Sequence, residues 1–251
     1  MAFLFWVMIG FLAQFIDGSL GMGYGVSAST LLIYFGIPPV ITSASVHTSE
    51  LFTTFVSGLA HFKFGNIRKD ILIPMVSFGI IGGIIGASGL VRLPQKPIKI
   101  VVALILLIMG CLIVYRFIFE YKRNNNFIIK KYSVNKLGIL GFFAALIDAI
   151  GGGGWGPICT PFLVVNGAEP HKAVGSVDLA EFFITVAISL TFMLFIGIES
   201  FRWDIVFALA LGGVIAAPLA AFSCRKIPRN LLAILVGITV ILLSLRLLLK
   251  R

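Results

Sequence analysis

Ten carboxylate side chains occur among the 251 residues, and those in strongly apolar surroundings are the first candidates for chemistry. They are Asp17, Glu50, Asp148, Asp178 and Glu181. An acid placed in hydrocarbon costs at least roughly 2.5–3.5 kcal/mol on insertion scales, so it normally faces the interior of a helix bundle and marks an ion pathway or proton relay. His47 shares these surroundings and titrates near neutral pH when unperturbed, which makes it a candidate proton sensor. We therefore expect these six side chains to form a proton-coupling group or pathway.

The composition places these acids in a membrane. Hydrophobic residues make up 59% of the chain and charged residues only 12%, whereas a soluble domain has about 25% charged residues. A water-soluble globule is therefore excluded. The net charge of +10 belongs to Lys and Arg residues between long apolar runs, which is typical of loops that face lipid headgroups and the cytoplasm. The lipid bilayer is the expected partner, and nucleic acid is not.

Several apolar stretches are long enough to cross a bilayer, which takes about 20 residues of helix. They are residues 71–91, 98–119, 182–198, 205–224 and 231–249. They do not alternate apolar with polar residues, as the strands of a lipid-facing barrel would. Residues 1–16 lack a basic start and a small-residue cleavage site, so we expect a retained membrane segment. The sequence thus predicts an all-α integral membrane protein.

The chain contains an internal repeat. When Asp148 is aligned on Asp17, glycine, proline, serine and glutamate residues coincide in one ungapped frame. The coincident pairs include Gly152 with Gly21, Gly154 with Gly23, Gly156 with Gly25, Ser176 with Ser45 and Glu181 with Glu50. We assign residues 1–119 to the first repeat, 120–136 to a basic linker expected in the cytoplasm, and 137–251 to the second repeat.

Each repeat has four segments: a helix interrupted by glycines, followed by three transmembrane helices. Duplicated halves with interrupted helices in corresponding positions indicate a secondary transporter whose site lies between the repeats. If the broken helices cross the membrane, the chain has about 8 spans and the repeats are parallel. If each break forms a re-entrant hairpin, the repeats are inverted. The distribution of Lys and Arg over the loops fits both topologies.

The two glycine breaks, residues 17–25 and 148–157, are candidate ligand sites. Their backbone is free to leave the helix, and the N–H groups of helices starting near Val26 and Pro157 would attract an anion. Ser29 and Thr30 are further candidate hydroxyl donors. The predicted substrate-binding residues are Gly21, Gly23, Gly25, Ser27, Gly152, Gly153, Gly154, Gly156 and Thr160. The alternative is that these glycines allow helices to pack closely, which is our interpretation of Gly79, Gly82, Gly83 and Gly86.

A polar stripe follows each break at steps of three or four residues, which is one face of a helix. The stripes contain Ser43, His47, Glu50, Thr54, Ser57 and His61 in the first half, and Asp178, Glu181, Thr185 and Ser189 in the second. The repeat superposes Asp178 on His47. A structural alternative stays open: Asp17 and Asp148 would cap a helix end or hold the break in place, while Glu50 and Glu181 would accept hydrogen bonds from the opposite break.

The remaining reactive side chains are not expected to do chemistry. His61 and His171 lie closer to loops and are expected to be solvated. Cys111, Cys159 and Cys224 have no CxxC or zinc-like spacing, so we expect them to be small packing residues. No cofactor and no metal is predicted.

With both breaks and both stripes in view, the chain resembles the TauE/SafE, or sulfite exporter, family of membrane permeases. The resemblance rests on residues 17–25, 43–50, 148–161 and 175–181 and covers nearly the whole chain. It implies transport of small sulfur-containing or organic anions across a bacterial or archaeal inner membrane, driven by a proton or sodium gradient. The first break departs from the usual run of glycines, because it alternates glycine with Met22 and Tyr24 and has Thr30 where the second half has Pro161.

These observations favour a secondary transporter of small anions such as sulfite, organosulfonates or carboxylates. A passive anion channel is the first alternative, because it too needs a polar pore. A membrane-embedded enzyme is the second, although the sequence has no HExxH, GxSxG or Walker motif. Assembly into a homo-oligomer stays open.

Overall fold

The computed structural model describes residues 2–115, 118, 132–223 and 229–249, and this part of the chain is helical without strands. The helices are α1 (Ala2–Leu20), α2 (Tyr24–Tyr34), α3 (Pro39–Lys63), α4 (Lys69–Arg92), α5 (Gln95–Tyr115), α6 (Val134–Gly151), α7 (Trp155–Val165), α8 (Pro170–Ile196), α9 (Trp203–Ser223) and α10 (Arg229–Leu249), with the 3₁₀ turn η2 (Ile198–Ser200) after α8. Most of the predicted basic linker lies outside the described residues.

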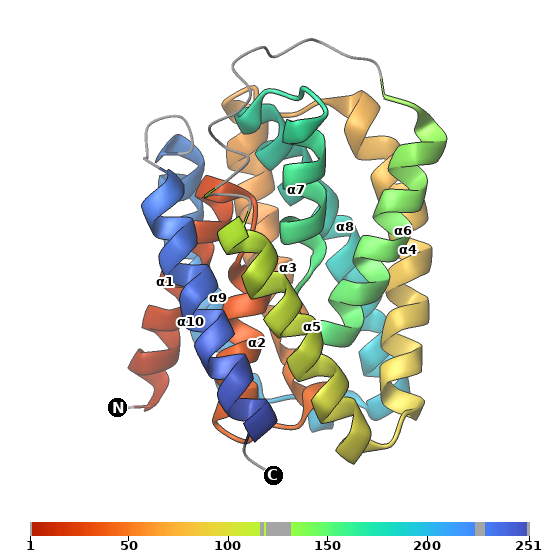
Figure 1. Cartoon of the computed structure of the whole chain (residues 1–251), viewed down its shortest axis with the longest axis vertical. Helices are drawn as coiled ribbons and strands as arrows, with labels where there is room; N and C mark the ends of the chain where they lie inside the picture. The colour runs from red at the N-terminus through yellow and green to blue at the C-terminus, as the bar shows by residue number, and fades with distance from the viewer. Residues whose placement is uncertain (1, 116–117, 119–131, 224–228, 250–251) are drawn as a thin grey trace.

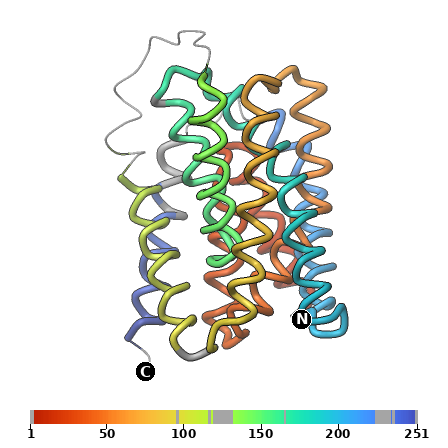
Figure 2. Tube along the Cα trace, turned by 90° about the vertical axis from the view of Figure 1, so that its right-hand side faces the viewer, coloured from red at the N-terminus to blue at the C-terminus, as the bar shows by residue number. Residues whose placement is uncertain are grey.

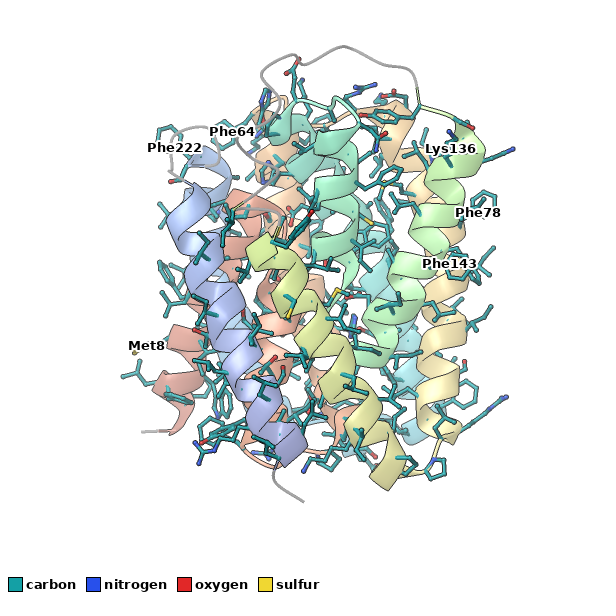
Figure 3. All side chains as sticks on the ribbon, viewed as in Figure 1. Met8, Phe64, Phe78, Lys136, Phe143 and Phe222 are labelled. Atoms are coloured by element: carbon teal, nitrogen blue, oxygen red, sulfur yellow. The ribbon has the colours of Figure 1, made fainter. Side chains whose placement is uncertain are left out.

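The surface of the bundle is that of a membrane protein. Six helices, α1, α4, α5, α6, α8 and α9, are long and apolar enough to cross a bilayer. Large apolar side chains point outward along the sides of the bundle, among them Met8, Phe78 and Phe143 (Figure 3). Such an extensive exposed apolar surface is unsuited to water and suited to lipid. The chain is therefore an all-α, multi-pass membrane protein, as its sequence predicts.

The first glycine break turns α1 back on itself. The ring of Phe35, just after α2, lies 5.8 Å from the ring of Phe5 and 5.7 Å from that of Trp6, both near the start of α1. The two helices therefore form a hairpin that begins and ends at the same end of the bundle, the lower end in Figure 1.

The second break makes the corresponding hairpin from the opposite end. Tyr132, just before α6, donates its hydroxyl hydrogen to the carbonyl oxygen of Leu163 near the end of α7, at 3.1 Å. This α6–α7 hairpin opens at the upper end, as Figures 1 and 2 show. Of the two topologies that the sequence allowed, the structure has re-entrant hairpins and inverted repeats.

Corresponding helices of the two halves pack through corresponding glycines. A Cβ atom on Gly141 of α6 would lie 2.7 Å from the carbonyl oxygen of Met75 in α4, and Gly10 of α1 approaches Leu209 of α9 in the same way. The predicted close-packing face of α4 is also confirmed, since Gly86 is pressed against the Leu146 carbonyl of α6. These contacts place both hairpins between helices of the other half.

The long polar helices α3 and α8 pack against each other and begin with Pro39 and Pro170, which suit the first turn of a helix. Their second turns make corresponding bonds to loops: the backbone N–H of Arg202 donates to Ser45, and that of Arg68 donates to Ser176. Both arginines lie in loops at the ends of the bundle. The hydrogen bond with Asp70 raises the pKa of the Arg68 guanidinium, which keeps a positive charge at this end.

Candidate functional site

The two glycine breaks meet at the centre of the protein. A Cβ atom on Gly25 would lie 2.8 Å from the carbonyl oxygen of Gly152, and one on Gly156 would lie 2.6 Å from that of Gly21. Gly153 is pressed against the backbone of Val26 in the same way. Because no side chain fits at these positions, the glycines allow two backbones to touch.

Three of the glycines at the breaks also have backbone conformations that favour glycine. Gly21 ends α1 with φ +70°, and Gly152 ends α6 with φ +69°. Gly23, immediately before α2, has φ 124°, whereas its counterpart Gly154 has an extended backbone with φ 175°. The two hairpin turns are thus nearly equivalent.

Crossed hydroxyl bonds tie the two breaks together. Thr160 of α7 donates to the carbonyl oxygen of Gly21 at 2.7 Å, and Ser29 of α2 donates to the carbonyl oxygen of Gly152. Thr30 donates to Val26 within its own helix. These hydroxyl groups, which the sequence suggested as ligand donors, are engaged by the backbone in this conformation.

The helices after the breaks start at Tyr24 and Trp155, two residues earlier than the sequence suggested. Asp17 accepts the N–H of Tyr24 at 3.4 Å, and Asp148 accepts the N–H of Trp155 at 3.2 Å. The two acids therefore cap the helix N-termini, as the structural alternative proposed.

Free backbone donors remain beyond these caps. The first N–H groups of a helix have no partner within it, and those of Gly25, Val26 and Gly156 make no hydrogen bond within the described residues. They lie at the positive ends of two helix dipoles, at the contact between the hairpins. This is the part of the site that is suited to an anion.

The second-half acid Asp148 is neutralised by a first-half histidine. His47 Nε2 lies 3.0 Å from the Asp148 carboxylate, and its Nδ1 lies 2.8 Å from the carbonyl oxygen of Ser43. A carbonyl oxygen only accepts, so Nδ1 carries a proton. A second proton must lie between Nε2 and the carboxyl group. Wherever that proton lies, the pair has no net charge.

The first-half acid Asp17 has no such partner. It lies with Asp178 and Glu181 of α8 in a buried group whose ligand oxygens are all within 4.8 Å of one another. Neither carboxylate oxygen of Asp178 has a hydrogen-bond partner other than Ser57 in the described part of the chain. Nor does any ion pair among the described residues include these three acids or Glu50.

Glu50 lies close to the break of its own half. A Cβ atom on Gly25 would lie 3.1 Å from Glu50 Oε1, and the other carboxylate oxygen has no partner within the described residues. The structure therefore places all six predicted ionisable side chains around the two breaks, in two groups of different charge.

Two expectations need correction. His61 is fully buried rather than solvated, because the end of α1 packs over it. Its Nε2 donates to the carbonyl oxygen of Gly18 at 3.1 Å while its Nδ1 accepts from Asn66, which is a neutral, fully bonded histidine. Ser27 lies apart from the other site residues and lines a cavity of about 280 Å³ between α1, α2 and α10.

The remaining histidine and the described cysteines lie away from the two breaks or in the core. His171 is partly exposed at the start of α8, where it pairs with Glu169 at 3.2 Å. Cys159 is buried in the core as expected, Cys111 is exposed on α5, and Cys224 lies outside the described residues.

Sequence reasoning missed Gln14, which is buried one helical turn before Asp17 and has no hydrogen-bond partner among the described residues. Its position three residues before Asp17 is the signal that could have identified it, because residues three apart share a helix face.

The chain is similar to known membrane proteins. The family model for the sulfite exporter TauE/SafE matches residues 6–247. "Probable membrane transporter protein YtnM" of Bacillus subtilis (strain 168) is 44% identical over 243 residues, which cover 95% of this chain and 80% of the relative. "Probable membrane transporter protein YunE" of the same strain is 23% identical over 115 residues, covering 45% of this chain and 42% of the relative.

No solved structure gives a significant match. The family match over nearly the whole chain confirms the resemblance found from the breaks and stripes. The chain belongs to the sulfite exporter TauE/SafE family and is a multi-pass membrane transporter.

Proposed function

We propose that the protein is a secondary transporter of small anions, of the sulfite, sulfonate or carboxylate class, and that an ion gradient drives it. The observation that supports this most is the meeting of two helix N-termini, with free N–H groups, between two groups of buried acids. The family name points to the same substrate class.

The free N–H groups of Gly25, Val26 and Gly156 suit an oxyanion because donors and dipoles both point at one place. Glycine leaves that backbone uncovered, so a small anion can approach it closely. The breaks are in contact here, and a substrate needs them to separate. Since the hairpins open at opposite ends of the bundle, movement of one half against the other would expose the site to each side in turn.

The buried acids couple the binding of the anion to the binding of the driving ion. An anion at the breaks would lie beside Asp17, which caps α2 and lies with Asp178 and Glu181, whereas Asp148 is already neutralised by His47. Like charges in a poorly solvated interior repel strongly. The anion therefore binds well only after protons or cations have neutralised the nearby acids, and this linkage makes the uptake of one depend on the other.

Flux measurements test the proposal. Purified protein in proteoliposomes would be given labelled sulfite, a sulfonate and a small carboxylate, with an imposed pH gradient, an imposed sodium gradient, or neither. We expect uptake of at least one anion to rise when one of the gradients is imposed. Protein-dependent flux that ignores both gradients would contradict the carrier and indicate a channel.

A glycine pair tests where the anion binds. Gly25→Ala introduces a methyl group into the contact between the breaks, at a typical overpacking cost of about 1–3 kcal/mol, and we expect uptake to fall at least about tenfold. Gly89→Ala in α4 is the control, because nothing lies within 4 Å of its added Cβ atom. Equal uptake by the two variants would contradict a site at the breaks.

A further inference from the structure

We propose that Asp17, Asp178 and Glu181 bind a hard metal cation, with the side chains of Gln14 and Ser57 completing the site. The inference deepens the proposed function, on which it rests, by assigning the coupling ion a place and a chemical class. The site lies where the end of α1 meets α3 and α8.

The three acids have the geometry of a cation site. One carboxylate oxygen from each residue lies within 4.8 Å of the other two, so one ion between them reaches all three. The side chains are buried, with Asp17 3%, Asp178 0% and Glu181 6% exposed. Ionised carboxylates without a counter-charge are very unfavourable in such a place.

Unpartnered polar atoms next to the acids point independently to a missing ligand. Ser57 lies beside Asp178, and both Ser57 and Gln14 are fully buried. A Cβ atom on Gly18 would lie 3.3 Å from Ser57 Oγ and 3.5 Å from Gln14 Nε2, which places both side chains beside Gly18, the residue that follows Asp17. Within the described residues the Gln14 amide makes no hydrogen bond, and the Ser57 hydroxyl has no partner other than Asp178 itself. Buried polar groups are rarely left unsatisfied, so these oxygens are available to a ligand.

The helix end adds to the negative character of the site. Gly18, next to Asp17, lies in the last turn of α1 at the negative end of the helix dipole, and the carbonyl oxygens of Asp17 and Gly18 accept hydrogen bonds from Gly21 and His61. The C-terminal ends of interrupted helices are where transporters coordinate coupling cations. All the available ligands are oxygens, which hard cations such as sodium, magnesium and calcium prefer.

The corresponding site around Asp148 contains a base that the site around Asp17 lacks. The position that corresponds to Asp178 is His47, which neutralises Asp148 directly. Among the described titratable groups around Asp17, Asp178 and Glu181, Glu50 is a further acid. His61 is the nearby base on α3, and both of its ring nitrogens are engaged by Gly18 and Asn66. No described base is therefore free to pair with Asp17, Asp178 and Glu181, and a bound cation would supply their counter-charge.

Thermal unfolding of the full-length protein in detergent tests the site without any anion. The chain would be prepared in choline chloride and titrated with sodium, potassium, magnesium or calcium at constant ionic strength. We expect one of these cations to raise the unfolding temperature by several degrees in a saturable manner, because a ligand that binds only the folded state stabilises it. If none of the four does so, and the stability responds only to pH, a proton occupies the site and the inference is wrong.

Two substitutions of Asp178 test its part in the site. Asp178→His supplies the base that the other half already has, so the cation-dependent rise should disappear while the cation-free protein stays folded. Asp178→Asn should also abolish the rise. Asp204→Asn, at an exposed carboxylate paired with Arg202, is the control and should retain it. A full cation response in both Asp178 variants would overturn the inference.

Different experimental results would contradict the cation site and the proposed function. Cation binding by a protein that carries no anion would leave the site in place and contradict the proposed function. Gradient-driven anion uptake by a protein that none of the four cations stabilises would contradict the site alone.

Discussion

The surroundings of Asp17 and Asp148 are alike in backbone and different in charge. Each acid caps the helix that follows its own break, Asp17 at Tyr24 and Asp148 at Trp155. Asp148 then contacts His47 at 3.0 Å, whereas Asp17 lies with two further acids. The duplicated scaffold therefore holds one site that neutralises itself and one that requires a ligand.

The scaffold itself does not explain this difference. The crossed hydroxyl bonds, the turn glycines and the close helix contacts occur in both halves. Among the ionisable residues of the two sites, the pair of corresponding positions that differs is His47 and Asp178. The comparison teaches that an inverted repeat can keep its geometry while its halves take on different electrostatic roles.

The largest expected effect comes from breaking the self-neutralised site. His47→Leu leaves Asp148 buried without a counter-charge, which typically costs about 3–5 kcal/mol. We expect a large fall in thermal stability in detergent. His171→Leu, at a partly exposed histidine, is the control. An unchanged melting temperature for His47→Leu would mean that the pair contributes nothing.

Removing an acid from the other site should have the opposite sign. Asp178→Leu eliminates an unpaired carboxylate, and apolar replacements of buried charges are often neutral or stabilising by about 1–4 kcal/mol. In cation-free buffer we therefore expect the variant to be at least as stable as the natural chain. A clear loss of stability there would show that Asp178 already has a partner in the folded protein.

The scaffold predicts equal effects in the two halves. Ser29→Ala and Thr160→Val each remove one of the crossed hydroxyl bonds between the breaks, worth about 1 kcal/mol. Melting of the two variants under the same conditions should show similar losses. Strongly unequal losses would mean that the two breaks are not mechanically equivalent.

The smallest net effect is expected from a full exchange. The double variant His47→Asp with Asp178→His moves the base from one half to the other, so its cation-free stability should stay within about 1 kcal/mol of the natural chain. A much larger loss would show that the surroundings of the two sites, and not these two residues, set their difference.

Much of this architecture follows from the sequence, because apolar length and glycine spacing are local properties. The helices, the two breaks and the packing face at Gly79–Gly86 are of this kind. Whether a break turns back or crosses depends on tertiary contacts such as that of Phe35 with Phe5. The distribution of Lys and Arg over the loops carries no information about those contacts.

The sequence predicts which residues lie at the site, but not how those residues interact. The stripes identified His47 and Asp178 as corresponding residues, but not that each contacts the acid of the opposite half. The burial of His61 under the end of α1, and the unpartnered amide of Gln14, both depend on how α1 packs against α3. Spacing along one helix does not contain that information.

Anion uptake by proteoliposomes, measured for the natural chain and for Asp178→His, tests the central claim most directly. The ion gradient that drives uptake by the natural chain would be imposed on both. We predict that uptake by the natural chain rises with that gradient, and that uptake by Asp178→His no longer responds to it because the base replaces the coupling ion. A variant whose uptake follows the gradient as steeply as the natural chain would contradict the claim that coupling depends on the acidic site.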